Sequence, residues 1–306
     1  MILKKKSRGK DVKELQIALN ALGYDAGEPD GIFGQGTEDA VESFQESSDT
    51  YVDGIVGKGT LHEINSALIA HGHEDLLFEI GDDLNLNEAS TKMKWVKVDA
   101  DIFPGRDGYN RLTLREDAAK SYNSLREEVH SLGGIMTTAG GKRSLAGKAS
   151  PSRSKKSMHY TGLAFDLALP TGMQNAKKDP YIVTDVGDRH WEVWCRTDNP
   201  DVPEVTLTSC VRKGKNLVKE EVTGRFFSFT EVAKKHGWER IRARRSFFRG
   251  GSYTGAEWWH FQWEQGLTRG ESKFGEELLK VYSMDQCKNF VYWDVAKNAV
   301  FGVDWF

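Results

Sequence analysis

The chain lacks any long apolar run, and no stretch approaches the roughly 18 apolar residues that a membrane-spanning helix requires. Its start, Met1 to Lys6, is basic but is not followed by an apolar segment with a small-residue cleavage site. We therefore expect no membrane span and no signal peptide. Work outside the cytoplasm would need another route of release.

Cysteine and excess charge are also scarce. Cys195, Cys210 and Cys287 are widely spaced and contain no C-x-x-C pair, which disfavours a disulfide framework or a thiolate zinc site. We expect buried thiols, with a Cys195–Cys210 bridge as the alternative. A formal net charge of −3 argues against a dedicated nucleic-acid binder but leaves local basic patches open.

A repeated motif is present near the N-terminus: Asp30–Thr37 reads D-G-I-F-G-Q-G-T, and Asp53–Thr60 reads D-G-I-V-G-K-G-T. Asp-Gly favours a tight turn, and the threonine of each copy is expected to cap a helix. Apolar residues recur at helical spacing around these turns: Leu15, Leu19, Leu22, Val41, Phe44, Leu61, Ile64 and Leu68. Together they predict a small three-helix domain over residues 1–70.

Two further helix-start signals are predicted in this segment. Asp11 with Glu14, and Thr60 with Glu63, have the spacing of a capping box. Residues 71–95 then turn acidic and lose periodicity, which indicates a linker. His71 and His73 lack a third ligand nearby, so a solvated pair is favoured over a metal site.

The repeated D-G-x-x-G-x-x-T turn resembles the peptidoglycan-binding domain found at the ends of many cell-wall hydrolases. That resemblance implies wall binding, whereas the spacing by itself indicates only a helical bundle. An unrelated bundle that reuses the turn is the alternative.

Residues 96–306 carry alternating and helical patterns typical of an α+β domain with a central antiparallel sheet flanked by helices. A capping box, Thr113 with Glu116, opens an amphipathic helix that Gly133 can end. Strands are expected at Ile135–Ala139, Leu163–Leu169 and Trp259–Glu264.

Four residues in two short clusters carry chemistry: His159 and Asp166, then Glu257 and His260. Two imidazoles and one carboxylate can hold zinc with a fourth position open to water, and Glu257 can take a proton from that water. Glu257 has the wrong parity for the strand that holds His260, so the chain must bend before that strand. Satisfied histidines and a solvated glutamate are the alternative.

The clusters read S-x-H-x-x-G-x-A-x-D from Ser157 and E-x-x-H from Glu257. They resemble the zinc D-Ala-D-Ala dipeptidase and carboxypeptidase family, which also contains phage peptidoglycan endopeptidases. The resemblance implies Zn²⁺ on His159, Asp166 and His260, and Glu257 as the general base. It also implies that Arg143 binds a substrate carboxylate. Ser157 is a candidate for orienting the ligand loop or the substrate.

This sequence departs from the family pattern at two places. Lys142 stands where a tyrosine is common before the arginine, and residues 171–224 form an insertion relative to compact members. These departures leave substrate choice open, and a solvated Arg143 is the alternative to substrate binding.

The expected function is hydrolysis of an amide bond in the peptidoglycan peptide stem, by a monomer. The missing signal favours a phage-type endolysin of L-Ala-D-Glu type, held in the host cytoplasm until lysis and then acting at the cell wall. A D-Ala-D-Ala carboxypeptidase is the alternative enzyme, because phage relatives often have aspartate where Glu257 stands. A non-catalytic wall-binding protein is the alternative from another class.

An arginine cluster near the second motif has no assigned role. It comprises Arg240, Arg242, Arg244, Arg245 and Arg249. A cationic rim facing an anionic wall polymer or membrane surface is one interpretation, and a solvated strand edge is the other. A nucleic-acid site is disfavoured because no binding motif accompanies the cluster. Trp191 and Trp194, in the insertion, are assigned either to sugar stacking or to a local core.

Overall fold

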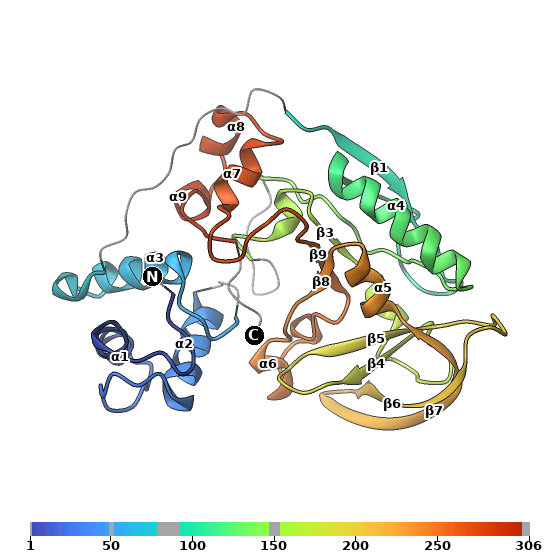
Figure 1. The fold of residues 1–306 in the computed structure, drawn as a ribbon, viewed down its shortest axis with the longest axis horizontal. Coiled ribbons are helices and arrows are strands. Elements are labelled where there is room, and N and C mark those ends of the chain that lie inside the picture. Colours follow the sequence, from blue (N-terminus) through green and yellow to red (C-terminus); the bar gives the residue numbers. More distant parts are fainter. Residues whose placement is uncertain (1, 49–51, 79–91, 147–153, 302–306) are drawn as a thin grey trace. The chain divides into compact units, whose positions relative to one another are not determined.

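The computed structural model describes residues 2–48, 52–78, 92–146 and 154–301 of the chain. It contains both helices and antiparallel sheets, which confirms the predicted α+β class (Figure 1). None of the helices among these residues combines the length and the apolar composition needed to cross a bilayer.

Contacts divide the chain into two compact units, described separately below. The helical unit comprises Met1–Lys92, Leu145–Ser157 and Gly266–Phe306, and the sheet unit comprises Met93–Ser144 and Met158–Gln265. The predicted domain and linker boundaries remain predictions, although the contacts group the C-terminal segment with the N-terminal helices.

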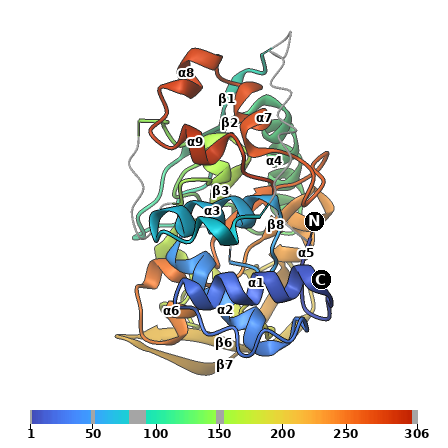
Figure 2. The same ribbon diagram turned by 90° about the vertical axis from the view of Figure 1, so that its left-hand side faces the viewer.

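Three helices form the N-terminal part of the helical unit (Figure 2). They are α1 (Lys10–Ala21), α2 (Gln35–Ser47) and α3 (Lys58–Ala70). Their apolar faces share one buried core, which includes Val12, Leu15, Leu19, Val41, Phe44, Leu61, Ile64 and Leu68. The helical faces predicted from spacing are therefore confirmed.

The repeated turns adopt the backbone that their Asp-Gly pairs favour, but the predicted threonine caps are wrong. Gly31 and Gly54 each have a φ of 74°, the left-handed region that glycine enters without strain. Glycines, not threonines or aspartate, precede the first helical residues: Gly9, Gly34 and Gly57 are the N-caps. Both capping boxes predicted in this segment are therefore absent.

A buried glutamine organises each repeated turn, and sequence spacing did not reveal it. The Gln45 amide nitrogen donates to Asp53 Oδ1 and to the Ile55 carbonyl, both at 2.8 Å, while Gln45 Oε1 accepts from the Asp53 and Gly54 amides. Gln16 makes the equivalent contacts to the first turn, including Asp30 Oδ1 at 3.0 Å and the Gly31 amide at 2.9 Å. Thr37 and Thr60 belong to these networks rather than to caps.

The segment predicted as a linker starts with ordered structure. A short helix, η1 (Glu74–Leu76), follows α3, and Phe78 is buried in the helical core. Residues 79–91 of the predicted linker lie outside the described residues. Three short helices near the C-terminus complete the helical unit: α7 (Phe274–Leu279), α8 (Met284–Lys288) and α9 (Trp293–Ala296).

The sheet unit distributes its strands over three antiparallel sheets rather than a single central one. The first pairs β1 (Trp95–Asp99) with β2 (Arg111–Arg115), and α4 (Glu116–Ser131) follows directly. The second has the order β3-β9-β8, with β3 (Ala164–Asp166), β9 (His260–Trp263) and β8 (Trp238–Arg240). It carries the candidate site. The helix α5 (Phe229–Lys235) precedes β8.

Several predicted element boundaries are wrong in this unit. Thr113 lies in β2, so the helix begins at Glu116 and has no capping box at its start. The expected strand at Ile135–Ala139 is reduced to an isolated bridge between Thr137 and Asp101. Likewise, β3 covers three residues of the expected Leu163–Leu169 strand, because the chain turns into η3 (Leu169–Thr171) soon after Asp166.

The predicted insertion builds most of the third sheet, in the order β4-β5-β7-β6. Its strands are β4 (Tyr181–Asp185), β5 (Trp191–Arg196), β6 (Glu204–Lys213) and β7 (Asn216–Ser228). In Figure 1, β6 and β7 form one long hairpin. Trp194 packs on a small core of this sheet, and Trp191 is 1% exposed, so the local-core interpretation holds for both tryptophans.

The three cysteines are buried free thiols, as expected. Burial raises the pKa of the Cys195 thiol to about 12, so the protonated form persists at neutral pH. The Cys195–Cys210 bridge that the sequence left open is absent.

Candidate metal centre

The candidate metal ligands meet where β3 and β9 pair. Asp166 lies directly opposite His260 in the antiparallel register, so residues 94 positions apart in the chain become cross-strand neighbours. His260 Nδ1 lies 3.0 Å from Asp166 Oδ1. His159 approaches from η2 (Met158–Tyr160), and its Nε2 lies 3.2 Å from Asp166 Oδ2. The three side chains therefore converge on one point.

A glycine turn orients His159. The Gly141 carbonyl oxygen can only accept a hydrogen bond, and it lies 2.6 Å from His159 Nδ1. This contact places a ring hydrogen on Nδ1 and makes Nε2, beside Asp166, the nitrogen available to a metal ion. A Cβ at position 141 would lie 2.5 Å from the Thr113 carbonyl oxygen, so this close approach of two backbones requires glycine.

The backbone of Asp166 is fixed by the same turn. Its amide donates to the Gly140 carbonyl at 3.0 Å, and its carbonyl accepts from the Ala139 amide at 2.8 Å. The Thr138 hydroxyl donates a further hydrogen bond to the Asp166 carbonyl at 2.9 Å. The turn that holds His159 thus also positions the carboxylate, which makes the pair a rigid unit.

Electrostatics in the cluster favour a carboxylate that faces positive charge. Burial opposes ionisation of Asp166, but the His159 and His260 imidazoles outweigh burial and hold the pKa of Asp166 well below its usual range. Burial likewise acts to lower the pKa of His260, but hydrogen bonding to Asp166 outweighs it and raises that pKa. A divalent cation bound between the three side chains would neutralise the Asp166 carboxylate in place of the imidazole N–H protons.

The donor set fits zinc. One ligand atom from each of His159, Asp166 and His260 lies within 4.8 Å of the others. The two imidazoles approach different oxygens of the carboxylate, at 3.0 Å for His260 and Asp166 Oδ1 and at 3.2 Å for His159 and Asp166 Oδ2. Ligand atoms about 2.0 Å from a tetrahedral zinc ion are separated by roughly 3.3 Å. Two imidazole nitrogens and one carboxylate oxygen are ligands that zinc accepts in catalytic sites.

The chain bends before β9, as the parity of Glu257 demands. A short helix, η4 (Tyr253–Gly255), precedes this bend, and Glu257 has a φ of 54°, a left-handed conformation that costs a non-glycine residue about 1 kcal/mol or more. The Glu257 carbonyl accepts a hydrogen bond from the His260 amide at 3.1 Å. The strained backbone of Glu257 is therefore held in place by the contacts around it.

The environment of Glu257 raises the pKa of its carboxyl group above the ordinary value. Burial raises the pKa of the Glu257 carboxyl and Asp166 adds to this, while His260 and Arg244 oppose it. A carboxylate with a raised pKa holds an abstracted proton more firmly than a solvated one.

The structure places Arg143 beside the ligand turn. Its amide donates to the His159 carbonyl at 2.9 Å, and its guanidinium carbon lies 5.5 Å from the centre of the Tyr160 ring. Arg143 Nη1 is buried and has no hydrogen-bond partner among the described residues. A buried, unpaired guanidinium nitrogen is suited to a carboxylate ligand. Ser157 groups with the helical unit, and its role remains a prediction.

The arginine cluster does not form a free cationic rim. Arg240 pairs with Glu192, Arg242 with Asp188 and Arg244 with Glu257. Their side chains are 27%, 11% and 21% exposed, so the solvated-edge interpretation is wrong for these three as well. Arg244 is a site residue that sequence reasoning missed, because its partner follows thirteen positions later across a bend.

Comparison with known proteins identifies the N-terminal segment. Residues 8–64 match the family described as "Putative peptidoglycan binding domain". This segment belongs to the peptidoglycan-binding family. The match therefore covers both repeated turns, α1, α2 and the first part of α3.

Curated relatives match a small part of the chain. The spike protein VgrG3 of the Vibrio cholerae type VI secretion system is 46% identical over 72 residues, which cover 19% of this chain and 7% of that protein. A spore cortex-lytic enzyme of Bacillus cereus is 41% identical over 59 residues, covering 19% of this chain and 23% of that enzyme. The chain thus spans less than a quarter of the length of these relatives.

Two solved structures are similar to parts of the chain. The SleB N-terminal domain is 37% identical, covers 22% of this chain and 92% of that one, and has a TM-score of 0.22. A fused Zn-dependent amidase/peptidase/peptidoglycan-binding domain-containing protein of Clostridium acetobutylicum is 16% identical and covers 77% of this chain and 87% of that one, with a TM-score of 0.21. At such TM-scores neither likeness carries an argument about the fold.

Proposed function

We propose that the sheet unit is a zinc peptidase that hydrolyses an amide bond in the peptide stem of peptidoglycan. The observation that carries this proposal is the convergence of His159, Asp166 and His260, with the partly buried Glu257 three residues before the last ligand. The peptidoglycan-binding segment supports a wall substrate, since it would keep the enzyme on its polymer. One of the curated relatives is a spore cortex-lytic enzyme, which also favours a lytic activity.

His159, Asp166 and His260 would hold the ion. Zinc in such a site acts as a Lewis acid on the scissile carbonyl and acidifies water. Glu257 accepts the proton of the attacking water and returns it to the leaving amine, which completes the cleavage with balanced protons. Arg143 binds a carboxylate of the stem through its unpaired guanidinium nitrogen and so orients the peptide. Ser157, two positions before His159, is assigned to support of the ligand loop or the substrate.

The proposed bond is internal, of L-Ala-D-Glu type, as in a phage-type endolysin that reaches the wall at lysis. Digestion of purified peptidoglycan followed by mass analysis of the muropeptides tests this choice. Release of the stem supports the endopeptidase. Loss of one terminal alanine would instead identify a D-Ala-D-Ala carboxypeptidase.

The same digestion tests catalysis itself. Glu257→Gln removes the proton acceptor but retains the side-chain volume, so we expect the rate to fall by about 100-fold or more. Glu127→Gln, an exposed position on α4, is the matched control and should clear the wall at the unmodified rate. Equal clearing by both variants would show that Glu257 is not the general base, whereas no clearing by the unmodified chain would leave the non-catalytic wall-binding protein.

A further inference from the structure

The turn that precedes Glu257 is held by Arg244 at two points. The Arg244 amide donates to the Gly255 carbonyl at 2.8 Å, which fixes the end of η4. Its side-chain Nε donates to Glu257 Oε1 at 3.2 Å. One residue therefore contacts both the turn and the carboxylate that the turn presents.

Glu257 needs such a restraint more than an ordinary strand residue does. Glu257 has a left-handed φ and lies before β9, which begins at His260. Its backbone is therefore not held by the hydrogen bonds between strands, and its side chain needs another contact to fix its direction. The side chains of Arg244 and Glu257 are 21% and 15% exposed, so water competes weakly for their ion pair.

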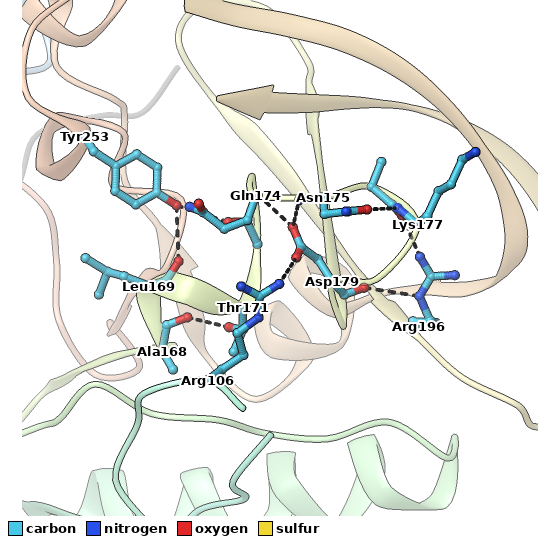
Figure 3. Close-up of polar contacts among 12 residues, drawn as sticks. Arg106, Ala168, Leu169, Thr171, Gln174, Asn175, Lys177, Asp179, Arg196 and Tyr253 are labelled. Atoms are coloured by element: carbon cyan, nitrogen blue, oxygen red, sulfur yellow. Dashed lines mark hydrogen bonds and ion pairs between the residues drawn. The ribbon is translucent and has the colours of Figure 1, made fainter. Parts of the chain in front are cut away.

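The other end of the turn is fixed separately, by Tyr253 (Figure 3). The Tyr253 hydroxyl lies 3.2 Å from the Leu169 carbonyl oxygen and 3.1 Å from that of Gly172, and it accepts a hydrogen bond from Trp258 Nε1 at 3.0 Å. Leu169 follows Asp166 by three positions, so this contact ties the approach to Glu257 to the exit from β3.

The loop after Gly172 is itself braced by a buried carboxylate. Asp179 is 1% exposed, accepts from the Gln174 and Asn175 amides at 2.7 Å each, and pairs with Arg106 at 3.1 Å (Figure 3). These contacts fix the backbone on which Tyr253 rests. They leave the direction of the Glu257 carboxylate to Arg244.

We propose that Arg244 is a positioning residue that sets the orientation of the Glu257 carboxylate for proton transfer. This inference rests on the proposed role of Glu257 as the base. Arg244 occupies Oε1, and the described residues provide no hydrogen-bond donor for Oε2, so Oε2 is the oxygen that takes the proton from water. Proton transfer depends steeply on such alignment, whereas substrate and metal binding do not.

The test replaces Arg244 by alanine and by lysine in the full-length chain. The backbone contact to Gly255 survives both changes, so the turn should persist. We expect Arg244→Ala to lower kcat on soluble muropeptides about 10- to 100-fold, with KM within twofold and zinc content unchanged. Arg244→Lys should recover part of the loss, because an ammonium group can still donate to Oε1.

Arg242→Ala is the matched control, since Arg242 lies in the same segment and pairs with Asp188 rather than Glu257. Guanidinium chloride at tens of millimolar should restore activity to Arg244→Ala in proportion to its concentration, and should not raise the activity of Arg242→Ala. Such rescue would show that free guanidinium replaces the missing side chain of Arg244 beside Glu257.

Several outcomes would overturn the inference. A kcat of Arg244→Ala equal to that of Arg242→Ala, a loss confined to KM, or a loss of bound zinc would each assign Arg244 another role. Where Arg244→Ala folds poorly, Arg244→Lys decides: a lowered kcat with KM and zinc content unchanged supports the assignment, and an unchanged kcat overturns it. The proposed function fails separately, if Glu257→Gln remains as active as the unmodified chain.

Discussion

The repeated turns of the helical unit and the metal cluster of the sheet unit achieve order in different ways. In the turns, Gln45 reaches Asp53 eight positions later, and Gln16 reaches Asp30 fourteen positions later. In the cluster, Asp166 meets His260 across 94 positions. The turns can be recognised in the sequence because the same short motif occurs twice. The metal cluster forms only because β3 and β9 pair.

The two regions also differ in how they treat charge. Around Gln45, neutral amide groups hold the buried Asp53 by hydrogen bonds. Around Asp166, a carboxylate faces two imidazoles, and the arrangement favours a cation. The first region is therefore a structural element, and the second is suited to chemistry.

Removal of the carboxylate ligand should give the largest effect, because it should lower zinc binding by the cluster without changing the helical unit. Asp166→Ala takes one of three ligands from the cluster, so zinc affinity should fall by at least the roughly 100-fold that loss of an outer-shell partner costs. Wall binding by the N-terminal segment should be unchanged. Metal content by atomic absorption and sedimentation with insoluble wall measure the two effects, with the exposed Asp201→Ala as control. A parallel loss of wall binding would show that the regions depend on each other.

Substitution of the buried glutamines tests the hydrogen bonds of the repeated turns. Gln45→Ala leaves buried polar groups of the second turn without partners, and we expect a loss of about 2–4 kcal/mol in the stability of the helical unit. Gln16→Ala should cost less, because Asp30 is exposed and water can replace the amide. Hydrogen exchange of α2 and α3 peptides measures both, and equal losses would contradict the ranking. Zinc content should not change in either variant.

Acid should weaken the sheet unit through another long-range ion cluster. Asp101 pairs with Arg126 and His130 of α4 and accepts from the Met136 amide. Burial opposes ionisation of Asp101, but these partners outweigh it and lower its pKa. Because folding lowers this pKa, the contribution is present above the unfolded value of about 3.9 and is lost as the pH falls through the folded value.

Asp101→Asn should therefore destabilise the sheet unit by about 1–2 kcal/mol at pH 7 and by much less at pH 3. Urea unfolding followed by tryptophan fluorescence reports mainly this unit, since seven of the nine tryptophans of the chain belong to it. The same difference at both pH values would show that the carboxylate contributes no charge-dependent stability.

The smallest expected effect concerns the start of α2. Gly34 is the N-cap, with extended backbone and no atom within 4 Å of an added Cβ. Gly34→Ser should stabilise the helix by a few tenths of a kcal/mol, because a serine hydroxyl can accept a hydrogen bond from the first turn. Thermal unfolding measures the gain. A loss of stability would indicate that the position is more constrained than its contacts show.

Sequence patterns predicted the three N-terminal helices, the turns at Gly31 and Gly54, and the identity of the peptidoglycan-binding segment. They also indicated the bend before β9, because the parity of Glu257 left no other way to reach the site. The predicted caps were wrong because a threonine hydroxyl can also bond within the turn. Thr60 donates to the Ile55 carbonyl in the turn network instead of capping the start of α3. Spacing cannot distinguish these uses, since both need a hydroxyl at the same position.

Arg244 shows a different limit. Its alternation with Arg240 and Arg242 indicated a common side and suggested a common role, yet each arginine has its own carboxylate partner. The partners come from β5, from the turn before β5 and from the bend before β9. Periodicity describes one segment at a time, so it could not identify charges contributed by others.

By itself, the sequence determined which residues can bind a cation, which helices form and where the repeated turns lie, because residue chemistry and local backbone preference act over short distances. Only the tertiary structure decided that His159, Asp166 and His260 face one point, and that Arg244 rather than solvent contacts Glu257. Pairing of β3 with β9 and the bend at Glu257 depend on contacts between segments nearly a hundred residues apart. Such contacts form when the chain packs, and no local pattern encodes them.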